Sequence, residues 1–159
     1  MDKKDFKNEA MRLLGNVKKQ AKKYAPTEFS DDKKFIRACA GTLSLMLIAD
    51  RVIEDQEVED GIDFLKSLGV VQELGLEKEA VEYFKEHVNK LKVAVEKGND
   101  DYIFAVEEIV MQVGDIKGLS DYREILLNLL QFLEDQSSFN PSEAKMKQKL
   151  IQALEPKPA

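Results

Sequence analysis

The chain has 159 residues, of which 43% are hydrophobic and 34% charged, with one cysteine and few glycines, prolines or aromatics. These proportions exclude a disordered chain, and a single cysteine excludes an internal disulfide framework. No apolar run approaches the roughly 20 residues that a membrane-spanning helix needs. The first ten residues, MDKKDFKNEA, contain no apolar signal core, so the sequence predicts a cytoplasmic protein with one domain over residues 1–159.

The first predicted element is a basic amphipathic helix over residues 1–25. Residues 1–24 hold eight bases and three acids, a net charge of +5, so the remainder must carry −11 of the total of −6. Such a helix can touch an anionic membrane surface or another anionic partner. The alternative is that it lies against the acidic part of its own chain, or only keeps the protein soluble. The candidate contact residues are Lys18, Lys19, Lys22 and Lys23.

Helical spacing of apolar residues continues along the rest of the chain, and no segment alternates for long enough to predict a strand. The sequence therefore predicts an all-α fold of about seven helices. The helical core is expected over residues 33–155, and the tail over residues 156–159 is expected to be loose.

Capping signals predict where several of these helices begin and end. The second helix is expected to open near Ser30 and, as the most apolar one, to be central. The third should begin near Glu54 and end at Gly69 as a C-terminal glycine. Asn99 or Asp100 is expected to cap the helix that follows Gly98.

An internal repeat is indicated by a shift of about 86 residues, which aligns the second and third helices with the last two. The match includes the turn between the helices and needs no gap. It predicts two similar helical hairpins that are related by a pseudo-twofold axis, each burying the apolar face of the other. The matched pairs include Leu43 and Leu129, Ile53 and Phe139, Glu57 and Glu143, and Leu68 and Leu154.

The first of these turns, IADRVIEDQEVEDG over residues 48–61, is strongly acidic. One interpretation is a hard-cation site in which Asp50, Glu54 and Glu57 supply oxygen ligands, although the spacing does not match an EF-hand loop. A catalytic carboxylate pair is less favoured, because the turn is expected to be wet and no nucleophile lies nearby in the sequence. No reaction is therefore predicted.

A structural interpretation of the turn competes with the cation site. Acids in the first turn of a helix satisfy its free N–H groups and its dipole. The equivalent stretch, residues 140–143, contains an N-cap asparagine, a proline at N1 and Glu143 at N3, as in a capping box. Glu57 and Glu143 are then capping residues. Asp50 is left without a partner, and we expect it to accept hydrogen bonds from the amides of its own turn.

Two further side chains that could carry chemistry are expected to be inert. Cys39 lies on the apolar face of the second helix, which predicts a buried, unreactive thiol. His87 is the only histidine and lies in the charged stretch Lys85-Glu86-His87, which predicts a surface residue. No basic patch with interleaved aromatics is present, so no nucleic-acid partner is predicted.

Taken together, these residues resemble the TerB family of tellurite-resistance proteins. The resemblance rests on Lys33-Lys34-Phe35, on Ala49-Asp50 followed seven residues later by Glu57, and on Phe64-Leu65-Lys66-Ser67. It covers about residues 33–154. The family's Asp-Gly is Asp50-Arg51 in this chain, and Gln136 stands where its second aspartate would be, with Asp135 one residue earlier.

The resemblance implies a non-catalytic, cytosolic protein of tellurite resistance and stress response. Such a protein would act through contacts with other proteins of that system, at the inner face of the membrane. The resemblance also implies metal-binding acids in the two turns, which here are Asp50 and Glu57 with Asp135 and Glu143 as second-repeat equivalents. Arg51 and Gln136 weaken that metal site, so the expected cofactor is none, with a divalent cation as the alternative.

Overall fold

The structure is a computed structural model that describes residues 8–12 and 30–156. All regular elements in these ranges are helical, which confirms the all-α prediction. Residues 8–12 form a helical segment that contributes the buried Ala10 to the core. The longer helices are α2 (Asp31–Ile48), α3 (Asp55–Ser67), α4 (Gly69–Leu74), α5 (Glu77–Lys97), α6 (Asn99–Gly114), α7 (Ser120–Ser137) and α8 (Pro141–Leu154).

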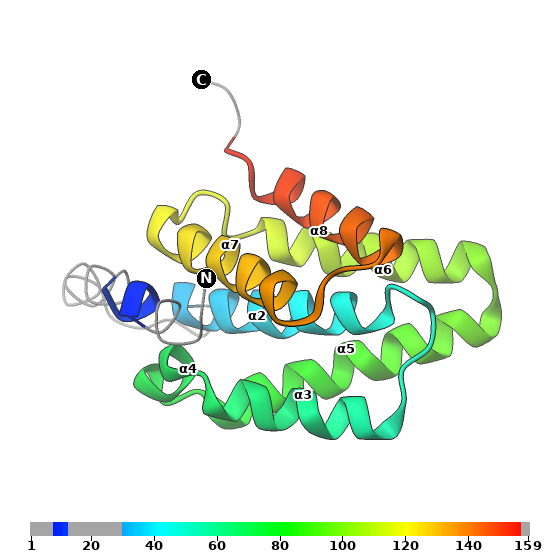
Figure 1. Ribbon diagram of the computed structural model, residues 1–159, viewed down its shortest axis with the longest axis horizontal. Coiled ribbons are helices and arrows are strands. Elements are labelled where there is room, and N and C mark those ends of the chain that lie inside the picture. The colour runs from blue at the N-terminus through cyan, green and yellow to red at the C-terminus, as the bar shows by residue number, and fades with distance from the viewer. Residues whose placement is uncertain (1–7, 13–29, 157–159) are drawn as a thin grey trace.

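Helix α2 is central, as its apolar sequence predicts. It runs through the middle of the molecule in Figure 1 and packs against α3, α5, α6, α7 and α8. Its start is fixed by Ser30, whose Oγ accepts a hydrogen bond from the amide of Lys33 at 3.2 Å. The N-cap prediction for Ser30 is therefore confirmed.

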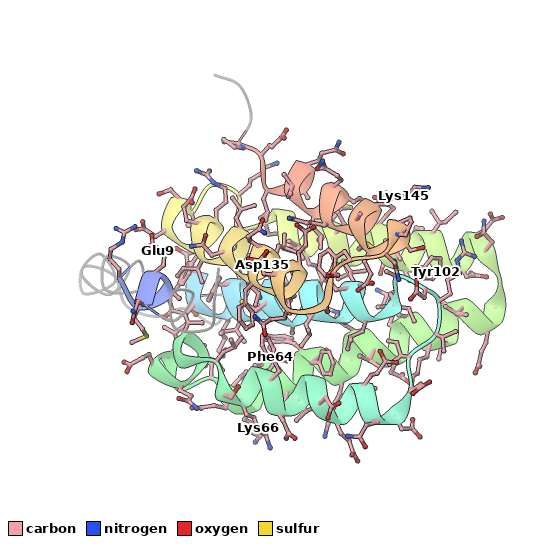
Figure 2. All side chains as sticks on the ribbon, in the orientation of Figure 1. Glu9, Phe64, Lys66, Tyr102, Asp135 and Lys145 are labelled. Atoms are coloured by element: carbon pink, nitrogen blue, oxygen red, sulfur yellow. The ribbon has the colours of Figure 1, made fainter. Side chains whose placement is uncertain are left out.

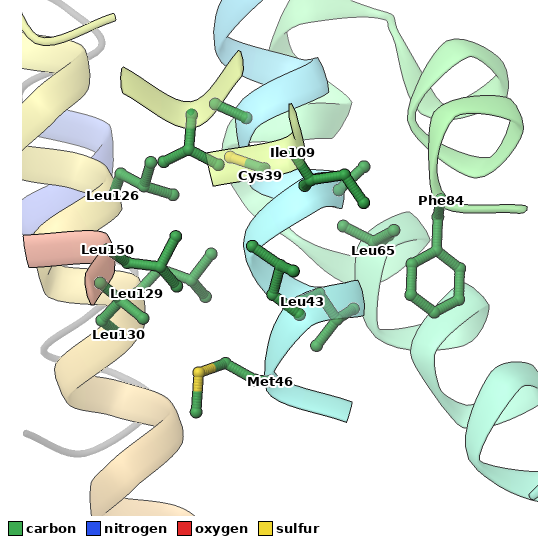
Figure 3. Packing of buried hydrophobic residues seen from close by; sticks show 14 of the residues in the cluster. Cys39, Leu43, Met46, Leu65, Phe84, Ile109, Leu126, Leu129, Leu130 and Leu150 are labelled. Atoms are coloured by element: carbon green, nitrogen blue, oxygen red, sulfur yellow. The ribbon is translucent and has the colours of Figure 1, made fainter. Parts of the chain in front are cut away.

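The core lies on both sides of α2. Figure 3 shows Leu43 and Met46 facing leucines of α7 and α8, while Ile109, Leu65 and Phe84 lie on the opposite side. Fully burying side chains of this size stabilises the fold by about 1.5–3 kcal/mol each. The packing is close at Gly61 of α3, where an added Cβ would lie 2.6 Å from Cζ of Phe84.

Two predicted helix ends are wrong. Helix α3 ends at Ser67, and Leu68 adopts an extended conformation, with its amide donating to the carbonyl of Leu65. Gly69 is therefore not a C-terminal glycine; it is the first residue of α4, a short helix that the sequence analysis missed. Asn99 and Asp100 lie inside α6, and Gly98, with φ of 140°, ends α5 and caps α6 at once.

The starts of α3 and α8 follow the predicted repeat. Asp55 and Pro141 are the first residues of these helices, and they are 86 positions apart. The pseudo-twofold axis itself stays a prediction.

The basic N-terminal helix over residues 1–25 lies mostly outside the described residues, and so do Lys18, Lys19, Lys22 and Lys23. Of the predicted loose tail, only Pro156 is described. Within residues 8–12 and 30–156, no helix combines the length and the apolar character needed to cross a bilayer.

Candidate functional site: an acidic pocket between two turns

The first turn of the site leaves α2 through Asp50 and Arg51. Arg51 has a positive φ of 65°, and its amide donates to the carbonyl of Ile48 at 2.6 Å. Its guanidinium lies over the ring of Tyr102 of α6, 4.5 Å from the ring centroid, while the Tyr102 hydroxyl donates to the carbonyl of Ile48 at 3.3 Å. This cation–π contact fixes the turn and directs the Arg51 charge toward α6.

Each of the two turns ends in a helix whose third residue is glutamate. In α8, Oε1 of Glu143 accepts from the amide of Asn140 at 3.2 Å, and Oδ1 of Asn140 accepts from the amide of Glu143 at 2.8 Å. The capping box predicted at residues 140–143 is therefore confirmed. In α3, Oε1 of Glu57 accepts from the amide of Glu54 at 3.1 Å, so Glu57 has the predicted capping role as well.

Asp50 connects the two turns. Both of its carboxylate oxygens accept from Nδ2 of Asn140 at 3.2 Å. The expected bonds to amides of its own turn are replaced by this bond to the N-cap residue of α8. This role of Asn140 was not predicted. The repeat places Asn140 and Glu54 at equivalent N-cap positions, and that equivalence was the only sign in the sequence that the two turns are related.

The two turns enclose a pocket of about 370 Å³. It brings together four of the five acidic residues that the sequence singled out, from both turns. Asp135 is not one of its lining residues: it lies on α7, where its Oδ1 accepts from Nε2 of Gln131 at 2.8 Å (Figure 2). The lining residues are Met46, Leu47, Asp50, Val52, Glu54, Glu57 and Glu143.

The pocket has a strong excess of negative charge. None of the ion pairs that join described residues includes any of its four carboxylates. Glu57 and Glu143 instead accept from amides at helix N-termini, and Asp50 accepts from the side-chain amide of Asn140. Met46 is buried and Leu47 half-buried, so the carboxylates lie beside an apolar wall. The arrangement suits a cationic group on an apolar stem.

The acids of the pocket are also the residues of the predicted metal site. Within the described ranges, no three His, Cys, Asp or Glu side chains are grouped so that they could hold a metal ion together. Asp50 also accepts from Asn140, and Glu57 and Glu143 each use one carboxylate oxygen in capping, which leaves the other oxygen open. Hard cations require several oxygen ligands at short, nearly equal distances. The metal site that the family resemblance implies at Asp50, Glu54 and Glu57 therefore stays a prediction.

Two side chains that the sequence analysis assigned as inert lie away from the pocket. Cys39 is buried, which confirms that part of its prediction, and burial raises the pKa of its thiol. His87 is not a surface residue: it is only 6% exposed. Burial, followed by the positive charges of Arg37 and Lys90, lowers its pKa to about 4, despite an opposing contribution from the Arg37 backbone.

The His87 prediction failed because its sequence neighbours are charged. Lys85 and Glu86 are exposed, as expected. Helical spacing predicts the burial of His87 better than its neighbours do. His87 lies three residues after Phe84 and four before Leu91, and both of these side chains are fully buried.

Comparisons with known proteins add no relative to this picture. No protein-family model, no curated protein and no solved structure matches the chain.

Proposed function

We propose that the chain is a non-catalytic helical module that binds a partner protein, with the acidic pocket receiving a lysine or arginine side chain of that partner. The observation that carries the proposal is the pocket itself. Two helix-starting turns, about 86 residues apart in the sequence, contribute four carboxylates to one cavity without a basic partner among the described residues. Charge-assisted hydrogen bonds to carboxylates are stronger than neutral ones, which favours such recognition.

The shape of the pocket supports a side chain better than a bare ion. Met46 and Leu47 offer an apolar wall for the methylene stem, while Glu57 and Glu143 lie on opposite turns, where they can accept from a charged head group. Val52, which is 63% exposed, also lines the pocket and would add apolar contact with the partner.

The biological setting is part of the same proposal. The resemblance to the TerB family supports a cytoplasmic role in stress response, including tellurite resistance, through other proteins of that system. The basic residues before Tyr24 support a second contact with an anionic membrane surface.

The test removes two negative charges from the pocket and keeps the N-terminal capping of α3 and α8. Glutamine serves in a capping box as glutamate does, so Glu57→Gln with Glu143→Gln preserves both helix starts. The matched control, Glu82→Gln with Glu96→Gln, removes the same charge from exposed positions on α5. Wild type and both double variants are used to capture proteins from the native host, with quantitative mass spectrometry. We expect partners that the pocket variant loses and the control retains, and an identical set for all three would overturn the proposal.

The metal alternative is tested separately by calorimetric titration with calcium, magnesium, manganese and zinc. We expect no saturable heat. A saturable heat in the wild type that Asp50→Asn abolishes would favour the cation site over the protein contact.

A further inference from the structure

Helix α6 presents an uncovered apolar strip to solvent. Phe104 is 67% exposed and Met111 is 71% exposed. The two residues are seven positions apart, which places them two turns apart on the same face of the helix. The opposite face of α6 is buried through Ile109 and Val113. An aromatic and a methionine side chain are thus left exposed on a helix whose packing needs are already met.

The strip is surrounded by acids. Between residues 99 and 115 the chain carries five acids and no base, namely Asp100, Asp101, Glu107, Glu108 and Asp115. None of the ion pairs that join described residues includes Asp100 or Asp101, which occupy the first turn of α6.

Three of the acids fix α6 in place without covering the strip. Glu107 binds Lys149 of α8 and Glu108 binds Lys90 of α5. Asp115 binds Arg37 of α2 at 3.0 Å. The five acids and these three bases together carry a net charge of −2, and Asp100 and Asp101 are the two acids left over.

We infer that this face of α6 is a docking surface for a basic amphipathic helix of a partner protein. The apolar face of that helix would cover Phe104 and Met111, and its lysines or arginines would pair with Asp100 and Asp101. Charge complementarity selects this occupant, because a second α6 would bring like charges together. Exposed methionine adapts to varied apolar surfaces, and aromatic residues dominate the affinity of such contacts. This surface is separate from the acidic pocket, whose lining contains no residue of α6.

The probe is a short, fluorescein-labelled leucine–lysine amphipathic helix, and its binding is followed by fluorescence anisotropy. Phe104→Ser with Met111→Ser should weaken binding at least about tenfold. Asp100→Asn with Asp101→Asn should weaken it less and reduce its dependence on salt. Glu59→Gln with Asp63→Asn, which alters two exposed acids of α3 that line neither this surface nor the pocket, should leave the affinity unchanged. Because all of these positions are exposed, thermal unfolding should confirm that every variant is folded.

Three results would overturn the inference. Equal affinity of the wild type and the Phe104→Ser, Met111→Ser variant would remove the docking surface. Loss of binding only in Glu57→Gln with Glu143→Gln would place the peptide in the acidic pocket. That result would support the proposed function and reject the α6 docking surface. Concentration-dependent self-association that the serine variant abolishes, measured by sedimentation velocity without peptide, would identify a second copy as the occupant.

Discussion

The side-chain amide of Asn140 donates to both carboxylate oxygens of Asp50 at 3.2 Å, and it joins two turns that are 90 residues apart. The same asparagine uses its Oδ1 to accept from the amide of Glu143 at 2.8 Å. One side chain therefore caps α8 and fastens that helix to the end of α2. The acidic pocket lies between the turns that this contact holds together.

This contact predicts a measurable coupling between the two residues. Asp50→Ala removes the acceptor, and Asn140→Ser removes the amide donor but keeps an N-cap oxygen. Because the bond is exposed, we expect a coupling free energy of about 0.5–1 kcal/mol in a double-mutant cycle of urea unfolding.

The control for that cycle is Gln136→Ala, at the repeat-equivalent position of Asp50. Gln136 is exposed, and it should show no coupling to Asn140→Ser. Strictly additive free energies for Asp50→Ala and Asn140→Ser would mean that the contact does not join the turns in solution.

Arg51 predicts a second effect on the same turn. A left-handed backbone costs a non-glycine residue about 1–2 kcal/mol, and the stacking on Tyr102 offsets part of that cost. Arg51→Ala loses the stacking and keeps the strain, so it should lower the free energy of unfolding by about 0.5–1 kcal/mol. Arg51→Gly loses the stacking but removes the strain, and it should be about 1 kcal/mol more stable than Arg51→Ala. Equal stabilities would contradict the left-handed conformation.

The sequence predicted those parts of the site that depend on local chemistry. Ser30, Glu57 and the stretch at residues 140–143 cap helices through bonds to amides within three residues, so spacing alone was sufficient. The bond between Asp50 and Asn140 depends on how two distant turns pack. The repeat indicated that the turns are alike, but no local pattern specifies which side chains meet across them.

A backbone change without a characteristic residue cannot be predicted from the sequence. The break between α3 and α4 occurs at Leu68, an apolar residue with φ of −65° and ψ of 122°. The chain bends at Leu68, whose side chain is buried. Neither a proline nor a left-handed glycine marks this bend in the sequence. A glycine after an amphipathic stretch predicts a helix end, whereas Gly69 is the first residue of α4.

His87 gives the last prediction, which concerns acid stability. Its pKa is lowered from 6.5 to about 4 by burial first and then by Arg37 and Lys90. Between these two values the unfolded chain binds a proton that the folded chain does not, so the folded state loses stability as the pH falls. From pH 7.5 to pH 5 this amounts to about 2 kcal/mol.

The measurement compares urea unfolding of the wild type and His87→Leu across that range. Leucine cannot be protonated, and the carboxylates common to both proteins cancel in the difference. The variant should therefore lose about 2 kcal/mol less than the wild type between pH 7.5 and pH 5. The Nε2 atom of His87 is buried without a hydrogen-bond partner among the described residues. Replacing the imidazole by leucine therefore breaks no hydrogen bond at Nε2. Parallel pH profiles for the two proteins would show that His87 is solvated and titrates normally.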